Sequence, residues 1–474
     1  MDAGAWSELM ASILGADAGT EPLPFTVVPY RAIVTATPSP HGRLTRRLGV
    51  RDAVAIGLAA MIGAGVFAVW APAAGAAGDW LLAGLAIAAV IAFANAGSTA
   101  QLAVRYPESG GAYRYGRERL GAWPGFLAGW GFVIGKTASC AAMALTAAAY
   151  LVPGTWQKPV AIIAVVVLVA VNLLGVTRTA GVASIIVSAV VAVLVVVVAA
   201  GVAVIAADGW GGAASVDGLT AADGPVPPVA GAYGVLQAAA LLFFAFAGYA
   251  RIATLGEEVR DPARTIPRAI GIAFAVVVTV YAAVGAAALG ALGANGLVES
   301  SAPLVDVVAA AGWVQAEPVV RVAAGVAALG SLLALIAGIG RTGLAMARDG
   351  ELPRRLTAVH PRFGVPHVAE IATGIAVVVL VLAADLRGAI GFSSFGVLLY
   401  YLVANASALT QPATERIVPR WLSWLGAIGC VVLVVTLPPL SIAAGVAVFV
   451  VGAAVRGIRL ARATRAGDDT RDAA

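Results

Sequence analysis

The sequence predicts an all-α, polytopic membrane protein with twelve transmembrane helices. Of its 474 residues, 61% are hydrophobic and only 12% are charged, which is about half the charged fraction of a soluble globular protein. Apolar runs recur along the whole chain, and its length accommodates about twelve spans of ~20 residues with short loops. Arginines gather in alternate loops, as in proteins that cross a bilayer repeatedly.

The predicted spans follow the apolar runs. They cover residues 52–74, 80–104, 125–150, 159–176, 181–206, 231–255, 270–293, 318–345, 368–385, 388–409, 418–435 and 438–459. Loops after even-numbered spans carry most of the arginines, whereas the 207–230 loop has aspartates and no basic residue. The positive-inside rule therefore places both termini in the cytoplasm. Because lysine is almost absent and Ala, Gly and Val dominate, we expect a bacterial cytoplasmic (inner) membrane.

The segments outside the spans are mixed in character. Residues 1–42 hold five prolines and no spanning run, and they lack the order of a signal peptide. We expect a disordered cytoplasmic tail there, or a start site assigned too early. Residues 301–320 predict an external half-helix before the eighth span. Residues 341–367 are too polar to span and predict short helices broken by prolines.

Glycines interrupt the first span at its midpoint, which a simple membrane anchor does not need. Glycine lowers the energetic cost of leaving helical geometry. Backbone groups freed in hydrocarbon are tolerated only where they line a cavity or find a partner. We therefore predict a helix break around Gly63 to Gly65, with a counterpart within residues 241–258 in the second half. Close helix packing through glycine is the alternative for either helix alone, but paired breaks favour a binding site.

Three segments resemble the amino acid–polyamine–organocation (APC) transporter superfamily. They are Gly63-Ala64-Gly65-Val66-Phe67, residues 243–270 with the run Glu-Glu-Val-x-x-Pro-x-x-x-Ile-Pro, and residues 341–366 with Ala-Met-Ala-Arg-Asp-Gly-x-Leu-Pro. The resemblance extends over residues 45–410. It implies a LeuT-like 5+5 inverted repeat with two additional helices. The transporter domain would cover 43–466, with repeats at 52–206 and 231–409, extra helices at 418–459 and a cytoplasmic tail at 467–474.

The resemblance also implies a substrate site at the two breaks. In such relatives, backbone N–H groups of the first broken helix hold an α-carboxylate, and carbonyls of both broken helices hold the α-ammonium. Helix dipoles favour the same arrangement. The implied substrate-binding residues are Ile62, Gly63, Ala64, Gly65, Phe243, Phe244, Phe246 and Ala247. Phe244 matches the aromatic gate position, and ordinary helix or lipid packing is the alternative for the phenylalanines.

Lone charges in the spans are the candidates for gating or coupling. Arg251 follows the sixth-helix glycine, where many relatives have an acidic residue, and an arginine at that depth costs about 2.5–3.5 kcal/mol. We expect Arg251 to bind a negatively charged part of the substrate or to belong to the cytoplasmic gate. A structural ion pair with Glu257 or Glu258 is the alternative. Glu257 is expected to pair with loop arginines and to shape the inner gate.

Lys136 is the other lone charge. Some proton-coupled relatives place a lysine in the fifth helix, where our alignment puts Val190. We predict that Lys136 supplies the charge instead and exchanges a proton during the cycle. Hydrogen bonding to carbonyls of the broken first helix is the alternative.

No catalytic triad, phosphate-cradling loop or metal-ligand spacing appears in the sequence. We therefore expect no enzyme activity, metal, cofactor or nucleic-acid partner. The favoured function is secondary active transport of amino acids or related amines by alternating access, coupled to protons. An amino acid exchanger is the main alternative, and a transporter-like sensor is a further one. The partners would be the small-molecule substrate, protons and the lipid bilayer.

Overall fold

The computed structural model describes residues 48–107, 110–175, 180–211, 231–253, 255 and 258–472, with backbone alone at 180 and 462–472. Over these residues the regular structure is helical, apart from one isolated parallel bridge between Leu48 and Val259. Ten helical segments are long and apolar enough to cross a membrane. The predicted all-α, polytopic class is therefore confirmed. Residues 1–42 and most of the 207–230 loop lie outside the described residues.

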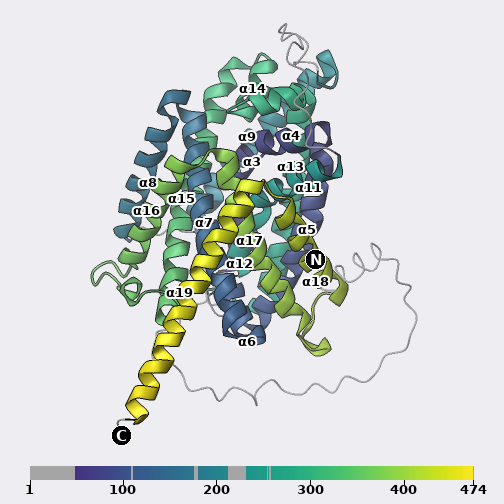
Figure 1. Cartoon of the computed structure of the whole chain (residues 1–474). Coiled ribbons are helices and arrows are strands. Elements are labelled where there is room, and N and C mark those ends of the chain that lie inside the picture. The colour runs from purple at the N-terminus through teal and green to yellow at the C-terminus, as the bar shows by residue number, and fades with distance from the viewer. Residues whose placement is uncertain are drawn as a thin grey trace, which may run out of the picture. The chain divides into compact units, whose positions relative to one another are not determined.

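The helices follow the order of the predicted spans (Figure 1). The first half of the chain contains α2 (Val50–Met61), α3 (Gly65–Ala68), α4 (Trp70–Ala77), α5 (Leu81–Arg105), α6 (Ala112–Leu120), α7 (Ala122–Leu151), α8 (Gln157–Leu173) and α9 (Ala180–Asp208). The second half contains α11 (Ala232–Phe246), α12 (Ala250–Ala253), α13 (Pro262–Glu299), α14 (Pro303–Ala310), α15 (Glu317–Arg348), α16 (His367–Ala383), α17 (Leu386–Leu409), α18 (Arg420–Thr436) and α19 (Pro439–Asp472).

Two predicted spans are shorter as helices than a typical membrane crossing. Helices α16 and α18 have 17 residues each, and they lie at the ninth and eleventh predicted spans. At ~1.5 Å per residue, each is about 25 Å long, against about 30 Å of hydrocarbon. Both are nonetheless apolar.

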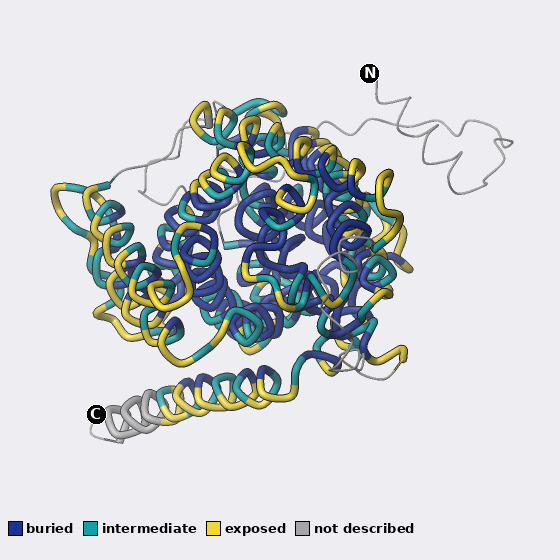
Figure 2. The backbone as a smooth tube through the Cα atoms, turned by 90° about the horizontal axis from the view of Figure 1, so that it is seen from above, coloured by how far each residue is buried: buried dark blue, intermediate teal, exposed yellow. Residues whose placement is uncertain are grey.

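The buried centre is formed by the alanine- and glycine-rich helices, and the valine-rich helices lie outside them. Figure 2 shows dark-blue helices at the centre and α19 along one side, with much of its surface exposed. Small residues let the central helices approach closely. A Cβ atom built on Gly396 of α17 would lie 2.6 Å from the Gly131 carbonyl oxygen of α7. The sequence thus packs α7 against α17 through backbone contacts.

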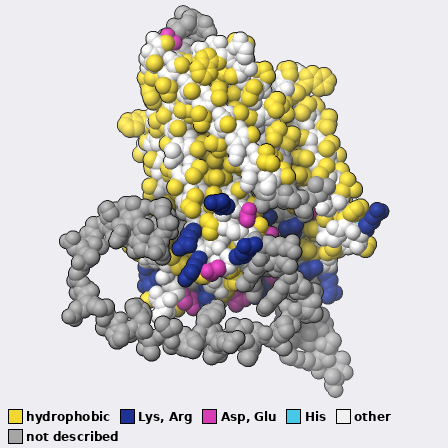
Figure 3. All heavy atoms as spheres, turned by 180° about the vertical axis from the view of Figure 1, so that it is seen from behind, with side chains coloured by type: hydrophobic (Ala, Val, Ile, Leu, Met, Phe, Trp, Pro, Cys, Tyr) yellow, Lys and Arg dark blue, Asp and Glu magenta, His cyan; other side chains and the backbone are white. Residues whose placement is uncertain are grey.

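The described surface divides into two zones. Figure 3 shows an apolar zone over most of the visible height, with Lys, Arg, Asp and Glu side chains collected toward one end. We refer to this end, which includes α6 and with it the linked residues Arg117, Glu351 and Arg456, as the charged end. Helix α6 lies at the charged end, and α14 lies at the opposite end (Figure 1).

Two details differ from the sequence predictions. The eighth predicted span ended at 345, and α15 continues slightly further, to Arg348. Met346 is completely buried against Tyr113 and Phe126, and Gly350 ends the helix with φ +76°, as helix-terminating glycines commonly do. Only the short 3-10 turn Arg354–Thr357 follows before α16. A short helix, α14, is present within residues 301–320, where a half-helix was predicted.

Candidate functional site

The first predicted helix break is present. Helix α2 ends at Met61, α3 begins at Gly65, and residues 62–64 between them belong to neither helix. All of them are buried. The backbone N–H groups of Gly63, Ala64, Gly65 and Val66 donate no hydrogen bond to any described residue. Because buried N–H groups carry partial positive charge, this stretch is chemically suited to an anionic group.

The second break follows directly after α11. This helix ends at Phe246 and is followed by a 3-10 turn, Ala247–Tyr249, and by the single turn α12. The change of pitch frees carbonyl groups at the C-terminal end of α11, where the helix dipole is negative. These carbonyls are suited to a cation or to hydrogen-bond donors.

The two breaks touch each other through glycines. A Cβ atom on Gly65 would lie 2.8 Å from Cα of Ala245, and one on Gly248 would lie 2.4 Å from the Ala60 carbonyl oxygen. No side chain could fit at either place without moving backbone. Glycine therefore allows the donor-rich first break to lie directly against the acceptor-rich second break.

Side chains from three surrounding helices donate hydrogen bonds to the freed carbonyls. Tyr281 Oη of α13 lies 2.5 Å from the Met61 carbonyl and 3.0 Å from the Ala245 carbonyl. The Ala247 carbonyl accepts from Tyr401 Oη of α17 at 3.1 Å and from Lys136 Nζ of α7 at 3.3 Å. Lys136 thus bonds to the second broken helix, and the alternative that it bonds carbonyls of the first is wrong.

Sequence analysis missed the two tyrosines. A tyrosine hydroxyl within an apolar span needs a hydrogen-bond partner. The presence of Tyr281 and Tyr401 in predicted spans therefore indicated that each forms a buried hydrogen bond. Which carbonyls they would reach could not be decided from the sequence. Both side chains are almost fully buried.

The three phenylalanines of α11 differ in their surroundings. Phe243 packs edge-on against Tyr401 at 5.8 Å between ring centroids, and Phe246 packs against Tyr281 at 5.1 Å. Phe244 has no ring contact with a described aromatic residue, and it is 7% exposed where the other two are fully buried. Of these three phenylalanine side chains, Phe244 is the most exposed and the one without an aromatic ring contact.

We expect Tyr281→Phe to lower the free energy of unfolding by about 1–2 kcal/mol, because it removes the donor shared by two buried carbonyls and keeps the ring. Ring contacts with Phe246 and Trp70 would remain. Melting temperatures of the detergent-purified variants would measure the change. Tyr233→Phe, at a 41% exposed position, is the control and should melt like the parent. Equal melting of all three proteins would contradict a role for Tyr281 in holding the breaks together.

Comparison with known proteins agrees with this geometry. The family model described as amino acid permease matches residues 52–464. The chain belongs to the amino acid permease family, within the APC superfamily. The match includes both breaks and the helices α7, α13 and α17 whose side chains bond to them.

Similar permeases and transporters occur in bacteria and plants. The chain is 55% identical to an uncharacterized transporter of Mycobacterium tuberculosis (strain ATCC 25618 / H37Rv), over 90% of this chain and 96% of the relative. It is 28% identical to the chloroplastic cationic amino acid transporter 7 of Arabidopsis thaliana, over 80% and 68%. It is 27% identical to the branched-chain amino acid permease of Bacillus subtilis (strain 168), over 71% and 74%.

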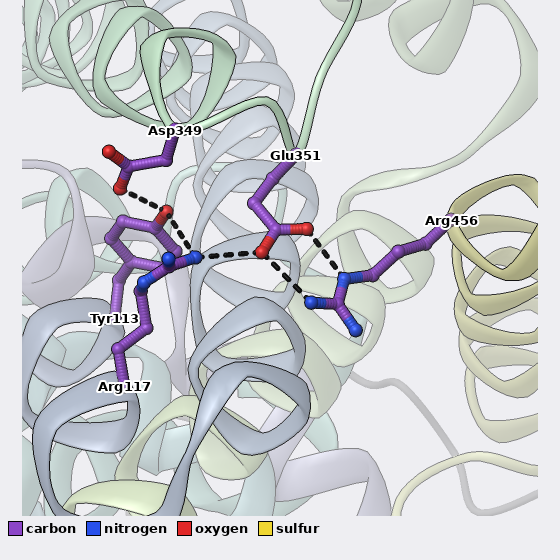
Figure 4. A network of polar contacts seen from close by, with 5 residues as sticks. All are labelled: Tyr113, Arg117, Asp349, Glu351 and Arg456. Atoms are coloured by element: carbon purple, nitrogen blue, oxygen red, sulfur yellow. Dashed lines mark hydrogen bonds and ion pairs between the residues drawn. The ribbon is translucent and has the colours of Figure 1, made fainter. Parts of the chain in front are cut away.

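At the charged end of this permease, one carboxylate joins three parts of the chain (Figure 4). Glu351 follows α15 and accepts from Arg117 of α6 at 2.7 Å. It also accepts two bonds from Arg456 of α19, at 2.5 Å and 3.0 Å. The Arg456 guanidinium lies 4.2 Å from the ring centre of Trp123, a distance that gives a favourable cation–π contact. Glu351 therefore ties α19 to the rest of the permease.

A tyrosine extends this network. Tyr113 Oη donates to Asp349 at 2.6 Å and accepts from Arg117 at 3.4 Å. Burial, and then the hydrogen bond to Asp349, raise the pKa of Tyr113 above its usual range. Burial alone would lower the pKa of Arg117, but Tyr113 and the two carboxylates raise it overall. The network thus favours the charged form of Arg117 and the protonated form of Tyr113.

Of the residues predicted to form the cytoplasmic gate, Arg251 lies in α12, directly after the second break. Arg251 of α12 has Arg341 of α15 and Glu258 as electrostatic neighbours. Glu257 lies outside the described residues. Close by, the Leu48 N–H donates to the Glu258 carbonyl at 3.0 Å, and the Arg260 N–H donates to the Leu48 carbonyl at 2.9 Å. This main-chain connection links the segments that flank the two broken helices, and sequence analysis did not anticipate it.

Proposed function

We propose that this permease is a secondary active transporter that moves amino acids or related amines by alternating access. The observation that carries the proposal is the contact between the two breaks. One offers four consecutive N–H groups, and the other offers carbonyl oxygens. An α-amino acid carries a carboxylate and an ammonium on one carbon and complements both. The carboxylate side of the site would be formed by Ile62, Gly63, Ala64 and Gly65. The other side of the site would be formed by Phe243, Phe244, Phe246 and Ala247.

Proton coupling through Lys136 is part of the proposal. Lys136 is 7% exposed, and its hydrogen-bond acceptor is a neutral carbonyl. Within the described residues no carboxylate forms an ion pair with it. A buried lysine without a counter-charge changes protonation state readily. We assign Phe244, Arg251 and Glu257 to gating.

The substrate class is supported by the relatives and the orientation by charge. Two relatives are named for cationic and for branched-chain amino acids, so we place the substrate of this chain among amino acids and their amines. Under the positive-inside rule, the charged end would face the cytoplasm together with both termini. Twelve helices, ten of them in a 5+5 repeat, would then cross the bacterial cytoplasmic membrane.

Uptake into proteoliposomes tests the function. We expect a labelled amino acid to accumulate under an imposed proton gradient of one polarity and to lose this accumulation when an uncoupler is added. Uptake that requires preloaded amino acid and ignores the gradient would indicate an exchanger. Folded protein that moves no amino acid or amine in either assay would contradict the proposal.

A further inference from the structure

The Ala247 carbonyl already binds an ammonium group. A carbonyl oxygen has two lone pairs, and those of Ala247 receive Tyr401 Oη at 3.1 Å and Lys136 Nζ at 3.3 Å. Both donors are buried. The second break therefore has a position with ammonium chemistry, and a side chain of the protein fills it.

The neighbouring carbonyls offer less to a ligand cation. Tyr281 Oη lies within hydrogen-bond distance of the Met61 and Ala245 carbonyls, but a hydroxyl has one proton and can serve only one of them at a time. A ligand ammonium that reached this cluster could bond to whichever of the two is left. To complete its coordination it would also need the lone pair on Ala247 that Lys136 now uses.

We infer that Lys136 is a tethered competitor for the substrate ammonium at the Ala247 carbonyl. This inference rests on the proposed function. When a substrate ammonium takes the lone pair, Lys136 loses its acceptor and lies beside a second cation. Like charges repel strongly at short distance in a dry site. Lys136 then releases a proton to solvent and remains as a neutral amine, while the substrate keeps its ammonium.

The surroundings of Lys136 offer no other charge to balance two cations. Cys140 is one turn away on α7, and Tyr401, Tyr400 and Tyr249 lie on the side of the second break. Cysteine and tyrosine are neutral near pH 7 at their ordinary pKa values. The ionisable residues of the packed helices α15 and α16, including Arg321, Arg341 and Glu370, lie toward the helix ends. Within the described residues, deprotonation of Lys136 is therefore the available way to relieve the repulsion.

Substrate and proton would thus occupy the site in turn. This places the permease among proton–substrate antiporters, because the form that carries the substrate has lost the proton. A symporter would require both to be bound together.

Direct binding to the detergent-purified full chain tests the inference. Isothermal titration with a panel of amino acids, in two buffers of different ionisation enthalpy, should show about one proton released per substrate bound, and tighter binding as pH rises. Lys136→Met should bind roughly tenfold or more tightly at acidic pH, since a competing charged hydrogen bond is removed. It should release no proton and lose the pH dependence.

The chain provides a matched control in its only other lysine. Lys158 is exposed, and its Nζ donates to the Leu382 carbonyl at 3.1 Å. Lys158→Met should leave both affinity and proton release as in the parent. A second variant, Lys136→Gln, guards against misfolding of the methionine variant, because it keeps a polar donor and removes the charge. It should also release no proton and lose the pH dependence, and it should bind more tightly than the parent at acidic pH, though less so than Lys136→Met, because its neutral donor can still compete for the Ala247 carbonyl.

The outcomes separate the two proposals. If the parent binds none of the panel while melting cooperatively, the proposed function fails and the inference fails with it. If the parent binds an amino acid but the Lys136 variants bind more weakly or with unchanged affinity, the inference alone is overturned, and Lys136 contacts the substrate carboxylate or only supports the fold. Proton uptake on binding would likewise overturn it and would indicate symport.

Discussion

Glu351→Gln is expected to lower the free energy of unfolding by about 3–5 kcal/mol, because it leaves two arginines in a buried site without their carboxylate. Glu351 and Arg456 are 7% and 5% exposed at the side chain, and Arg117 is 28% exposed. Water can therefore solvate Arg117 in part, but it cannot solvate Arg456. The melting temperature and the midpoint of an SDS titration should both fall.

The control for Glu351 is another glutamate paired with an arginine. Glu118 lies 3.2 Å from Arg114, and both side chains are about two-fifths exposed. Exposed pairs of this kind contribute less than about 1 kcal/mol, so Glu118→Gln should leave the midpoint almost unchanged. In a double-mutant cycle, Arg456→Met should recover part of the loss in Glu351→Gln. Equal effects of the Glu351 and Glu118 variants would show that burial of the network does not matter.

Gly248→Ala is expected to reduce transport at least tenfold, even where protein accumulates in the membrane. The added methyl would lie 2.4 Å from the Ala60 carbonyl oxygen and 2.5 Å from its carbon. These atoms belong to the backbone of α2 and cannot rotate away, so the two breaks must separate. Overpacking of this kind typically costs about 1–3 kcal/mol. Proteoliposome uptake and melting temperature together measure the two effects.

Gly338→Ala is the matched control for Gly248→Ala. It lies within α15, and a Cβ atom there would have no atom within 4 Å. Alanine should stabilise the helix by about 0.5–1 kcal/mol relative to glycine, with transport retained. If Gly248→Ala transports as well as Gly338→Ala, the contact between the breaks is not required for function.

The positions of the helices and of the first break were predictable because both depend on local sequence. Apolar runs of spanning length define helices without reference to their neighbours, and Gly63 and Gly65 weaken the helix that contains them. The boundaries were less accurate where packing decided them. Met346 is buried, and α15 continues past Ala345, where the predicted span ended, to Arg348.

The partners at the site were not predictable, because they depend on contacts between distant parts of the chain. Lys136 is 111 residues from Ala247, and Arg456 is 105 residues from Glu351. The sequence showed that a lysine within a span needs an acceptor, but both breaks offered carbonyls of the same chemistry. The packing of α17 against both α7 and α11 brings Lys136 to the second break.

The bridge between Leu48 and Val259 has a consequence for evolution. Its two hydrogen bonds use only main-chain atoms, so side-chain replacement does not remove them. Homologues can drift at both positions and still keep the segments before α2 and after α12 connected. Residue conservation would not reveal such a connection, whereas a proline at Leu48 or Arg260 would abolish one of its donors. Selection should therefore act there mainly against proline.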